Sequence, residues 1–106
     1  MATIFTRLMQ KYPKAKIYAM DLFNYNRSGE HNPTGNSTTQ NIMIYNDELR
    51  RLCNAFGVGL IEISKCGINA VNSADYTVET GTTHLHPNAV GHSLICDAVL
   101  KAFRSN

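Results

Sequence analysis

The sequence has no long apolar run and little net charge. No apolar stretch approaches the roughly 20 residues that a membrane-spanning helix needs, so we expect no membrane span. Ten basic and eight acidic residues leave a formal charge of +2, which is too weak to indicate a nucleic-acid or membrane-surface partner. The chain reaches Arg7 before any apolar h-region develops, so this segment does not predict a signal peptide.

The sequence also lacks a disulfide framework. Its three cysteines, Cys53, Cys66 and Cys96, form no C-x-x-C pair, and their odd number argues against systematic pairing. Free cysteine behaves as a small hydrophobe, so we expect buried or half-buried thiols. What is present is a globular composition, with 106 residues of which 43% are apolar and 17% charged, sufficient for one domain at most.

Helical and strand patterns alternate along the chain. Apolar residues at helical spacing predict helices over residues 2–12, 41–56 and 88–103. Short apolar runs predict two buried parallel strands over residues 15–20 and 58–63. This order is typical of an α/β layer fold with a parallel sheet. Two strands make a very narrow sheet, so either another chain completes it or the chain is part of a larger domain.

Two long segments between these elements are expected to be irregular. Residues 24–40 are rich in Asn, Ser, Thr and Gly, and a loop of this length is usually functional or mobile, so it is a candidate border of a substrate cleft. Residues 64–86 lead into a cluster that holds three of the four histidines, namely His84, His86 and His92. Catalytic groups of open α/β sheets gather at the carboxyl ends of strands, and histidine can act there as a general base.

The histidine cluster resembles a known family, and the residues that carry the resemblance are His86-Pro87-Asn88-Ala89-Val90-Gly91-His92. They are similar to the last sequence block of the SGNH or GDSL-type ester hydrolases, in which Asp-x-x-His runs into Pro-Asn-x-x-Gly and the C-terminal helix. Residues 12–18 are similar to the family's penultimate strand and the helix end before it, and residues 45–58 to the helix before its last strand.

The resemblance implies a fold, a reaction and a role for one residue. The implied fold is a partial flavodoxin-like three-layer α/β/α domain, of which residues 1–106 form the C-terminal part. The implied reaction is hydrolysis of a small carboxylic ester by a Ser-His-Asp triad, with no cofactor. By position, His86 is the base that takes the proton of a serine hydroxyl and returns it to the leaving alcohol.

The sequence departs from the family pattern where the other catalytic groups are expected. It contains neither Gly-Asp-Ser nor Gly-x-Ser-x-Gly, and the family's oxyanion blocks have no counterpart. The family's acid lies three residues before the histidine, where this chain has Thr83, which can orient an imidazole but carries no charge. Glu79 is the alternative acid if the loop folds back. We therefore expect a chain that carries the base, lacks the nucleophile and is not an efficient esterase alone.

Two other functions stay open. A non-catalytic α/β module would form a homodimer through the open edge of its sheet. A small zinc protein would use four residues near the C-terminus, His84, His86, His92 and Cys96. The spacing of these four matches no zinc-finger pattern, and Cys96 is expected in the core instead.

Two carboxylates lie at or near the ends of the predicted strands. Asp21 follows the first apolar run and Glu62 is near the end of the second. A pair of carboxylates can perform acid–base chemistry. In this setting we expect them instead to accept backbone hydrogen bonds or to face solvent.

Overall fold

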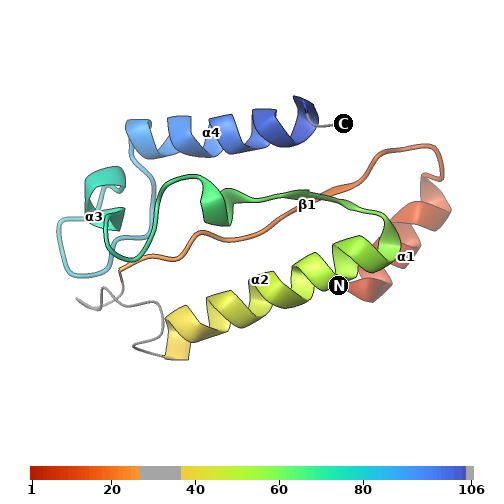
Figure 1. Cartoon of the computed structure of the whole chain (residues 1–106), viewed down its shortest axis with the longest axis horizontal. Helices are drawn as coiled ribbons and strands as arrows, with labels where there is room; N and C mark the ends of the chain where they lie inside the picture. Colours follow the sequence, from red (N-terminus) through yellow and green to blue (C-terminus); the bar gives the residue numbers. More distant parts are fainter. Residues whose placement is uncertain (27–36, 105–106) are drawn as a thin grey trace.

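A computed structural model describes residues 1–26 and 37–104 of the chain and shows helices and strands in alternation (Figure 1). The elements in chain order are α1 (Ala2–Lys11), β1 (Tyr18–Met20), α2 (Ser37–Phe56), β2 (Gly59–Ile61), the 3-10 helix η1 (Ile63–Lys65), α3 (Ser73–Tyr76) and α4 (Ala89–Arg104). The expected mixed α/β class is therefore confirmed. Within the described ranges, no helix combines the length and apolar character that crossing a membrane requires.

The two strands form a parallel sheet, as expected from the helix between them. Tyr18 is in register with Gly59, and Met20 with Ile61. The ladder continues by one hydrogen bond beyond each end of β1. The Gly59 amide donates to the Ile17 carbonyl, and the Asp21 amide donates to the Ile61 carbonyl. Parallel strands need a crossover connection, and α2 provides it.

Apolar side chains cover both faces of this sheet and produce three layers. On one face, the buried cluster consists of Phe5, Leu49, Cys53 and Val58, from α1, α2 and the residue before β2. On the other face, α4 packs its stripe of Leu94, Ile95, Ala98, Val99 and Ala102 against a second buried cluster. Figure 1 shows α4 on one side of the strands and α1 and α2 on the other.

Element boundaries differ from expectation where tertiary contacts override local composition. Helix α2 begins at Ser37 instead of residue 41, although the first three residues of this extension, Ser-Thr-Thr, are poor helix formers. Thr39 is fully buried there, and its carbonyl accepts a hydrogen bond from the Asn24 side chain. Within the loop expected over residues 24–40, residues 27–36 lie outside the described part of the chain. The segment 64–86, expected to be mostly irregular, contains most of η1 and the short α3.

Helix α1 buries only part of its predicted apolar face. Phe5 is 3% exposed and meets the ring of Phe56 edge-on, with 5.8 Å between the ring centroids. Ile4 and Leu8 are 54% and 37% exposed, and Tyr12 just beyond the helix is 52% exposed. The sequence pattern therefore identifies an apolar stripe that this chain does not cover with its own described residues.

Candidate functional site

The loop over residues 77–88, which carries His84 and His86, is fixed where it joins α3 and α4 by hydrogen bonds of Asn88. The Asn88 amide donates to the Tyr76 carbonyl at 2.8 Å, and the Asn88 side chain donates to the Asp75 carbonyl at 3.1 Å. The Asn88 side-chain oxygen accepts the Gly91 amide at 2.9 Å, so Asn88 caps α4 as an asparagine at this position is expected to do. The asparagine thereby joins the start of α4 to the end of α3.

Gly91 permits the close approach of these two helices. A Cβ atom at this position would lie 2.3 Å from the Tyr76 carbonyl oxygen and 3.1 Å from Pro87 Cβ. The first distance is far below van der Waals contact and involves backbone, which cannot easily move away. The Pro-Asn-x-x-Gly part of the motif is therefore explained by packing and by the Asn88 cap.

Beyond these hydrogen bonds of Asn88, the two arms of the loop run antiparallel. Thr77 and Pro87 form an isolated antiparallel bridge, and the Val78 amide donates to the His86 carbonyl at 2.9 Å. Pairing at these two positions folds residues 79–85 into a closed turn. Glu79, the first residue beyond the paired arm, is thereby brought opposite His86.

The resulting contact joins Glu79 to both the backbone and the ring of His86. The Glu79 carboxylate accepts the His86 amide at 2.8 Å and the Leu85 amide at 3.1 Å. The His86 ring Nδ1 lies 2.9 Å from Glu79 Oε2. The glutamate side chain is 24% exposed and that of His86 is 74% exposed. A carboxylate at Nδ1 favours the tautomer with its proton on that nitrogen, which leaves Nε2 to accept a proton.

This geometry lowers the pKa of Glu79. Burial of the carboxyl raises its pKa, but the hydrogen bonds from the His86 amide, the His86 ring and the Leu85 amide stabilise the charged form and outweigh burial. The carboxyl therefore stays ionised below the ordinary titration range of a glutamate. A charged acceptor is available to the imidazole at neutral pH.

The carboxylate that contacts His86 thus comes from Glu79, seven residues before it, which the sequence offered as the alternative to Thr83 at the family's acid position. Thr83 lies in the same turn and is half-buried. The neighbouring His84 is attached elsewhere, since its amide donates to the Asn26 carbonyl at 2.9 Å. No sequence rule places residue 79 opposite residue 86, because the contact depends on the bridge between Thr77 and Pro87.

The structure does not assemble the zinc alternative. Nowhere in residues 1–26 and 37–104 do three or more His, Cys, Asp or Glu side chains meet in a way that could hold a metal ion. The expectation that Cys96 lies in the core is wrong: Cys96 and His92 are both exposed, because α4 turns its other face toward the sheet. Cys53 is buried as expected, and burial raises the pKa of its thiol.

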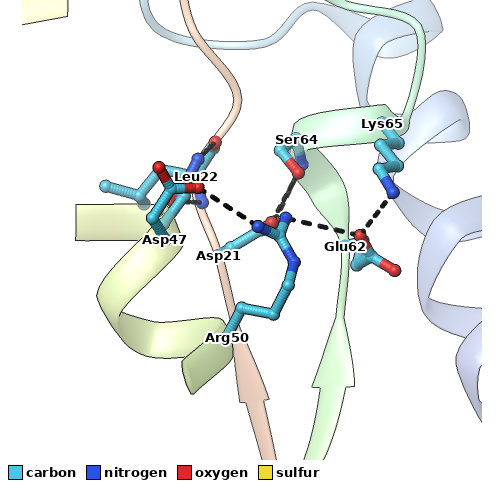
Figure 2. Close-up of polar contacts among 8 residues, drawn as sticks. Asp21, Leu22, Asp47, Arg50, Glu62, Ser64 and Lys65 are labelled. Carbon is cyan, nitrogen blue, oxygen red and sulfur yellow. Dashed lines mark hydrogen bonds and ion pairs between the residues drawn. The ribbon is translucent and has the colours of Figure 1, made fainter. Parts of the chain in front are cut away.

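At the strand ends, Asp21 accepts a backbone hydrogen bond, as expected. It is fully buried, and its carboxylate accepts both the Ser64 amide at 2.8 Å and the Ser64 hydroxyl at 2.5 Å. Figure 2 shows this pair between the ends of the two strands. Asp21 therefore ties the chain leaving β1 to η1, which follows β2.

Glu62 belongs to a separate group of surface ion pairs. Lys65 contacts its carboxylate at 3.0 Å and Arg50 at 3.6 Å, and Arg50 also reaches Asp47 at 3.2 Å (Figure 2). The hydrogen bond from Lys65 is the main cause that lowers the pKa of Glu62, with Arg50 adding to it against burial. These side chains are one-third or more exposed, so the pairs contribute little to stability.

The outer edge of β1 carries a feature that the sequence analysis missed. The side-chain amide of Asn46 accepts the Leu22 amide at 3.0 Å and donates to the Leu22 carbonyl at 2.7 Å. It pairs with the backbone as a neighbouring strand would. A polar residue within the buried stripe of α2 is the only sequence signal for this contact, and it does not specify the partner.

The chain resembles a known protein in its fold and not in its sequence. No family model matches the chain, and no curated protein matches it. Among solved structures, the fold is similar to that of LAE5, described as an alpha/beta hydrolase enzyme from the metagenome of Lake Arreo, Spain, with a TM-score of 0.62 and 19% sequence identity. At this level of identity the likeness shows a shared fold and no more. The match covers 94% of this chain and 44% of LAE5, so the chain spans less than half of that protein's length.

Proposed function

We propose that this chain is the C-terminal, base-bearing part of an SGNH-type ester hydrolase domain. The observation that carries the proposal is the 2.9 Å contact between His86 Nδ1 and Glu79 within the His-Pro-Asn-x-x-Gly loop. The pair has the relation that a base and its orienting acid have in a hydrolase triad. The hydrolase-like fold is consistent with this function.

In the proposed mechanism, the chain supplies proton transfer. His86 Nε2 accepts the proton of a serine hydroxyl as that oxygen attacks the ester carbonyl, and then gives the proton to the leaving alcohol. In the second half of the reaction it takes a proton from the water that attacks the acyl-enzyme, and returns it to the serine oxygen as the bond to the acyl group breaks and the carboxylic acid leaves. Glu79 holds the ring and stabilises the imidazolium. The substrate class is a small carboxylic ester.

The serine nucleophile is proposed to come from polypeptide outside this sequence. No Gly-Asp-Ser occurs in the chain, and the exposed stripe of α1 together with the two-stranded sheet fits a domain that is incomplete in these 106 residues. The high exposure of His86 is consistent with a base whose partner surface lies elsewhere.

The deciding experiment is intact-mass measurement after incubation with a fluorophosphonate, which phosphonylates activated serines, with His86→Ala alongside. We expect no stoichiometric adduct on either protein. An adduct on the unmodified chain that disappears in His86→Ala would show that a serine of this chain is the nucleophile, and would overturn the proposed division of the catalytic groups.

The base itself is tested with diethyl pyrocarbonate, which acylates unprotonated imidazole nitrogen. We expect His86 to react faster than the exposed His92, and Glu79→Gln to slow His86 severalfold without changing His92. Site-resolved mass spectrometry measures both rates in one sample. Equal rates at His86 in the original chain and in Glu79→Gln would exclude a functional pair.

A further inference from the structure

A closed ring of hydrogen bonds links both ends of the segment that carries Glu79 and His86 to Asn26, in the chain that follows β1. The Asn26 amide donates to the Ser73 hydroxyl at 2.8 Å, and the His84 amide donates to the Asn26 carbonyl at 2.9 Å. Ser73 in turn accepts the Thr77 hydroxyl on its carbonyl at 2.7 Å. The bridge between Thr77 and Pro87 closes the ring.

The polar members of this ring are buried. Ser73 is 0% exposed, Asn26 is 4% exposed and Thr77 is 6% exposed. A buried amide that loses its acceptor cannot recover the hydrogen bond from bulk solvent, so the chain must move or tolerate the unsatisfied donor. The ring is therefore stiff, in contrast to the exposed turn that it supports.

We propose that Ser73 is a positioning residue that, through its hydroxyl and its carbonyl together, links the chain leaving β1 to the His86–Glu79 pair. Residues 21–26 leave β1 in an extended course that is fixed at Asp21 by Ser64 and at Leu22 by Asn46. Ser73 is the point at which this fixed segment meets α3. The hydrogen bond from the Thr77 hydroxyl to the Ser73 carbonyl then fixes the start of the arm of the turn that leads to Glu79, two residues after Thr77. The inference rests on the proposed function of His86 and Glu79.

The role depends on two hydrogen bonds of Ser73, and a separate substitution removes each of them with little change of shape. Ser73→Ala keeps the Cβ and suits a helix, but it removes the acceptor of the Asn26 amide. Thr77→Val keeps the shape of the side chain and removes the donor to the Ser73 carbonyl. The two variants break neighbouring links of the same ring and should have the same consequence at Glu79.

The test measures the pair directly in the whole chain. The Glu79 carboxyl is titrated by carbon-13 NMR, and amide hydrogen exchange is followed at Leu85 and His86, which both donate to Glu79. In Ser73→Ala and Thr77→Val we expect the Glu79 pKa to rise toward its ordinary value. We expect the exchange of the His86 amide to accelerate about fivefold, the factor that corresponds to loss of one net hydrogen bond.

Three controls separate positioning from general destabilisation. Thr77→Ser retains the hydroxyl and should restore the titration of Glu79. Thr80→Val changes an exposed threonine of the same turn and should leave the pair as it is. Amides of α2 such as those of Leu49 and Cys53 should exchange at their original rates in all variants, whereas a global loss of stability would accelerate them too.

The outcomes distinguish this inference from the function on which it rests. Unchanged Glu79 titration and His86 exchange in both folded variants would overturn the role of Ser73 and leave the proposed function standing. An ordinary Glu79 pKa in the unaltered chain would overturn the His86–Glu79 pair itself and the inference with it. If Ser73→Ala does not fold, Thr77→Val compared with Thr77→Ser decides the question alone.

Discussion

Glu79 accepts hydrogen bonds from two consecutive backbone amides and from an imidazole ring. The two backbone hydrogen bonds to Glu79 do not depend on the His86 ring, so the turn holds the carboxylate in place whether or not the ring contacts it. A histidine that rotates away from such an acceptor leaves the turn intact. The glutamate is therefore a preformed acceptor for Nδ1, and the two backbone amides help to keep its pKa low whatever the state of the ring.

The lowered pKa of Glu79 predicts a pH-dependent difference in stability between the chain and Glu79→Gln. Because the folded-state pKa lies below the unfolded value of about 4.3, the ionised carboxyl stabilises the fold above that pH. The stabilisation disappears as the pH falls through the folded-state pKa. We expect the original chain to be more stable than Glu79→Gln by about 1 kcal/mol near pH 6, the net value of a typical hydrogen bond.

Urea unfolding of both proteins at pH 6 and near pH 3 measures this difference. Other acidic groups titrate over the same range, but they are common to both proteins and cancel in the comparison. The free energies of unfolding should converge at the lower pH. A difference that is constant over the range would mean that the carboxyl acts by its shape and not by its charge.

At the scale of elements, the contact between α3 and α4 is the structural core of the site. Four residues after Pro87, Gly91 leaves room for the Tyr76 carbonyl, and Asn88 binds both helices. A four-residue helix such as α3 has too few internal hydrogen bonds to persist in isolation. Its position, and with it the start of the arm that leads to Glu79, depends on α4.

This dependence predicts that Gly91→Ala destabilises the protein although alanine is the better helix former. The added methyl would lie 2.3 Å from a backbone oxygen, and such overpacking typically costs about 1–3 kcal/mol. The gain in helix propensity, about 1 kcal/mol, offsets only part of this cost. Urea unfolding measures the net effect. Gly81→Ala is the matched control, because no atom lies within 4 Å of its added Cβ, and it should not lower stability.

The two roles of Asn88 predict an order of stability among its variants. Asn88→Asp keeps the oxygen that caps the Gly91 amide and loses the donor to the Asp75 carbonyl, whereas Asn88→Ala loses both. Loss of an N-cap costs about 1 kcal/mol, so Asn88→Ala should be the least stable of the three proteins. Thermal unfolding followed by circular dichroism gives the order. If Asn88→Asp were as unstable as Asn88→Ala, the tie to α3 would matter more than the cap.

The elements that could be predicted from sequence are those that depend on local spacing. The three long helices α1, α2 and α4, the parallel strands and the His86 motif all follow from periodicity or from a run of a few residues, whereas η1 and α3 were not predicted. The pairing of Glu79 with His86 depends on an antiparallel bridge that no turn signal announces. The contacts of Ser73 with Asn26 and of Asn46 with Leu22 span 47 and 24 positions, so only the folded chain brings them together.

At the scale of the whole molecule, the described part of the chain leaves several large apolar side chains exposed. The exposed apolar side chains include Ile4 and Leu8 on α1 and Met20 and Leu22 at the outer edge of β1.

The geometry of that edge defines where another strand can bind. The backbone groups of Ile17 and Asp21 bond to β2, so those of Tyr18, Met20 and Leu22 face the other way. The Asn46 side chain bonds both the amide and the carbonyl of Leu22, so another strand cannot pair with Leu22. In the flavodoxin-like strand order the penultimate strand has neighbours on both sides, so the earlier strands of the proposed complete domain would pair at Tyr18 and Met20.

An open edge of this kind predicts concentration-dependent self-association of the isolated chain. Lysine on an edge strand is a common natural block to such pairing, because it places a charge where a second strand would bury it. We therefore expect Met20→Lys to weaken association by about tenfold or more, equivalent to about 1.4 kcal/mol.

Val71→Lys is the matched control, since Val71 is also exposed, at 71%, but lies in the segment before α3. Sedimentation equilibrium over a hundredfold range of concentration measures all three proteins. If the chain forms a single dimer, and if Met20→Lys dissociates it but Val71→Lys does not, the dimerising α/β module is favoured. A continuous series of larger species would indicate an edge that a different polypeptide normally covers. A chain that stays monomeric throughout would contradict the prediction, because the edge groups of Tyr18 and Met20 would then be satisfied by water alone.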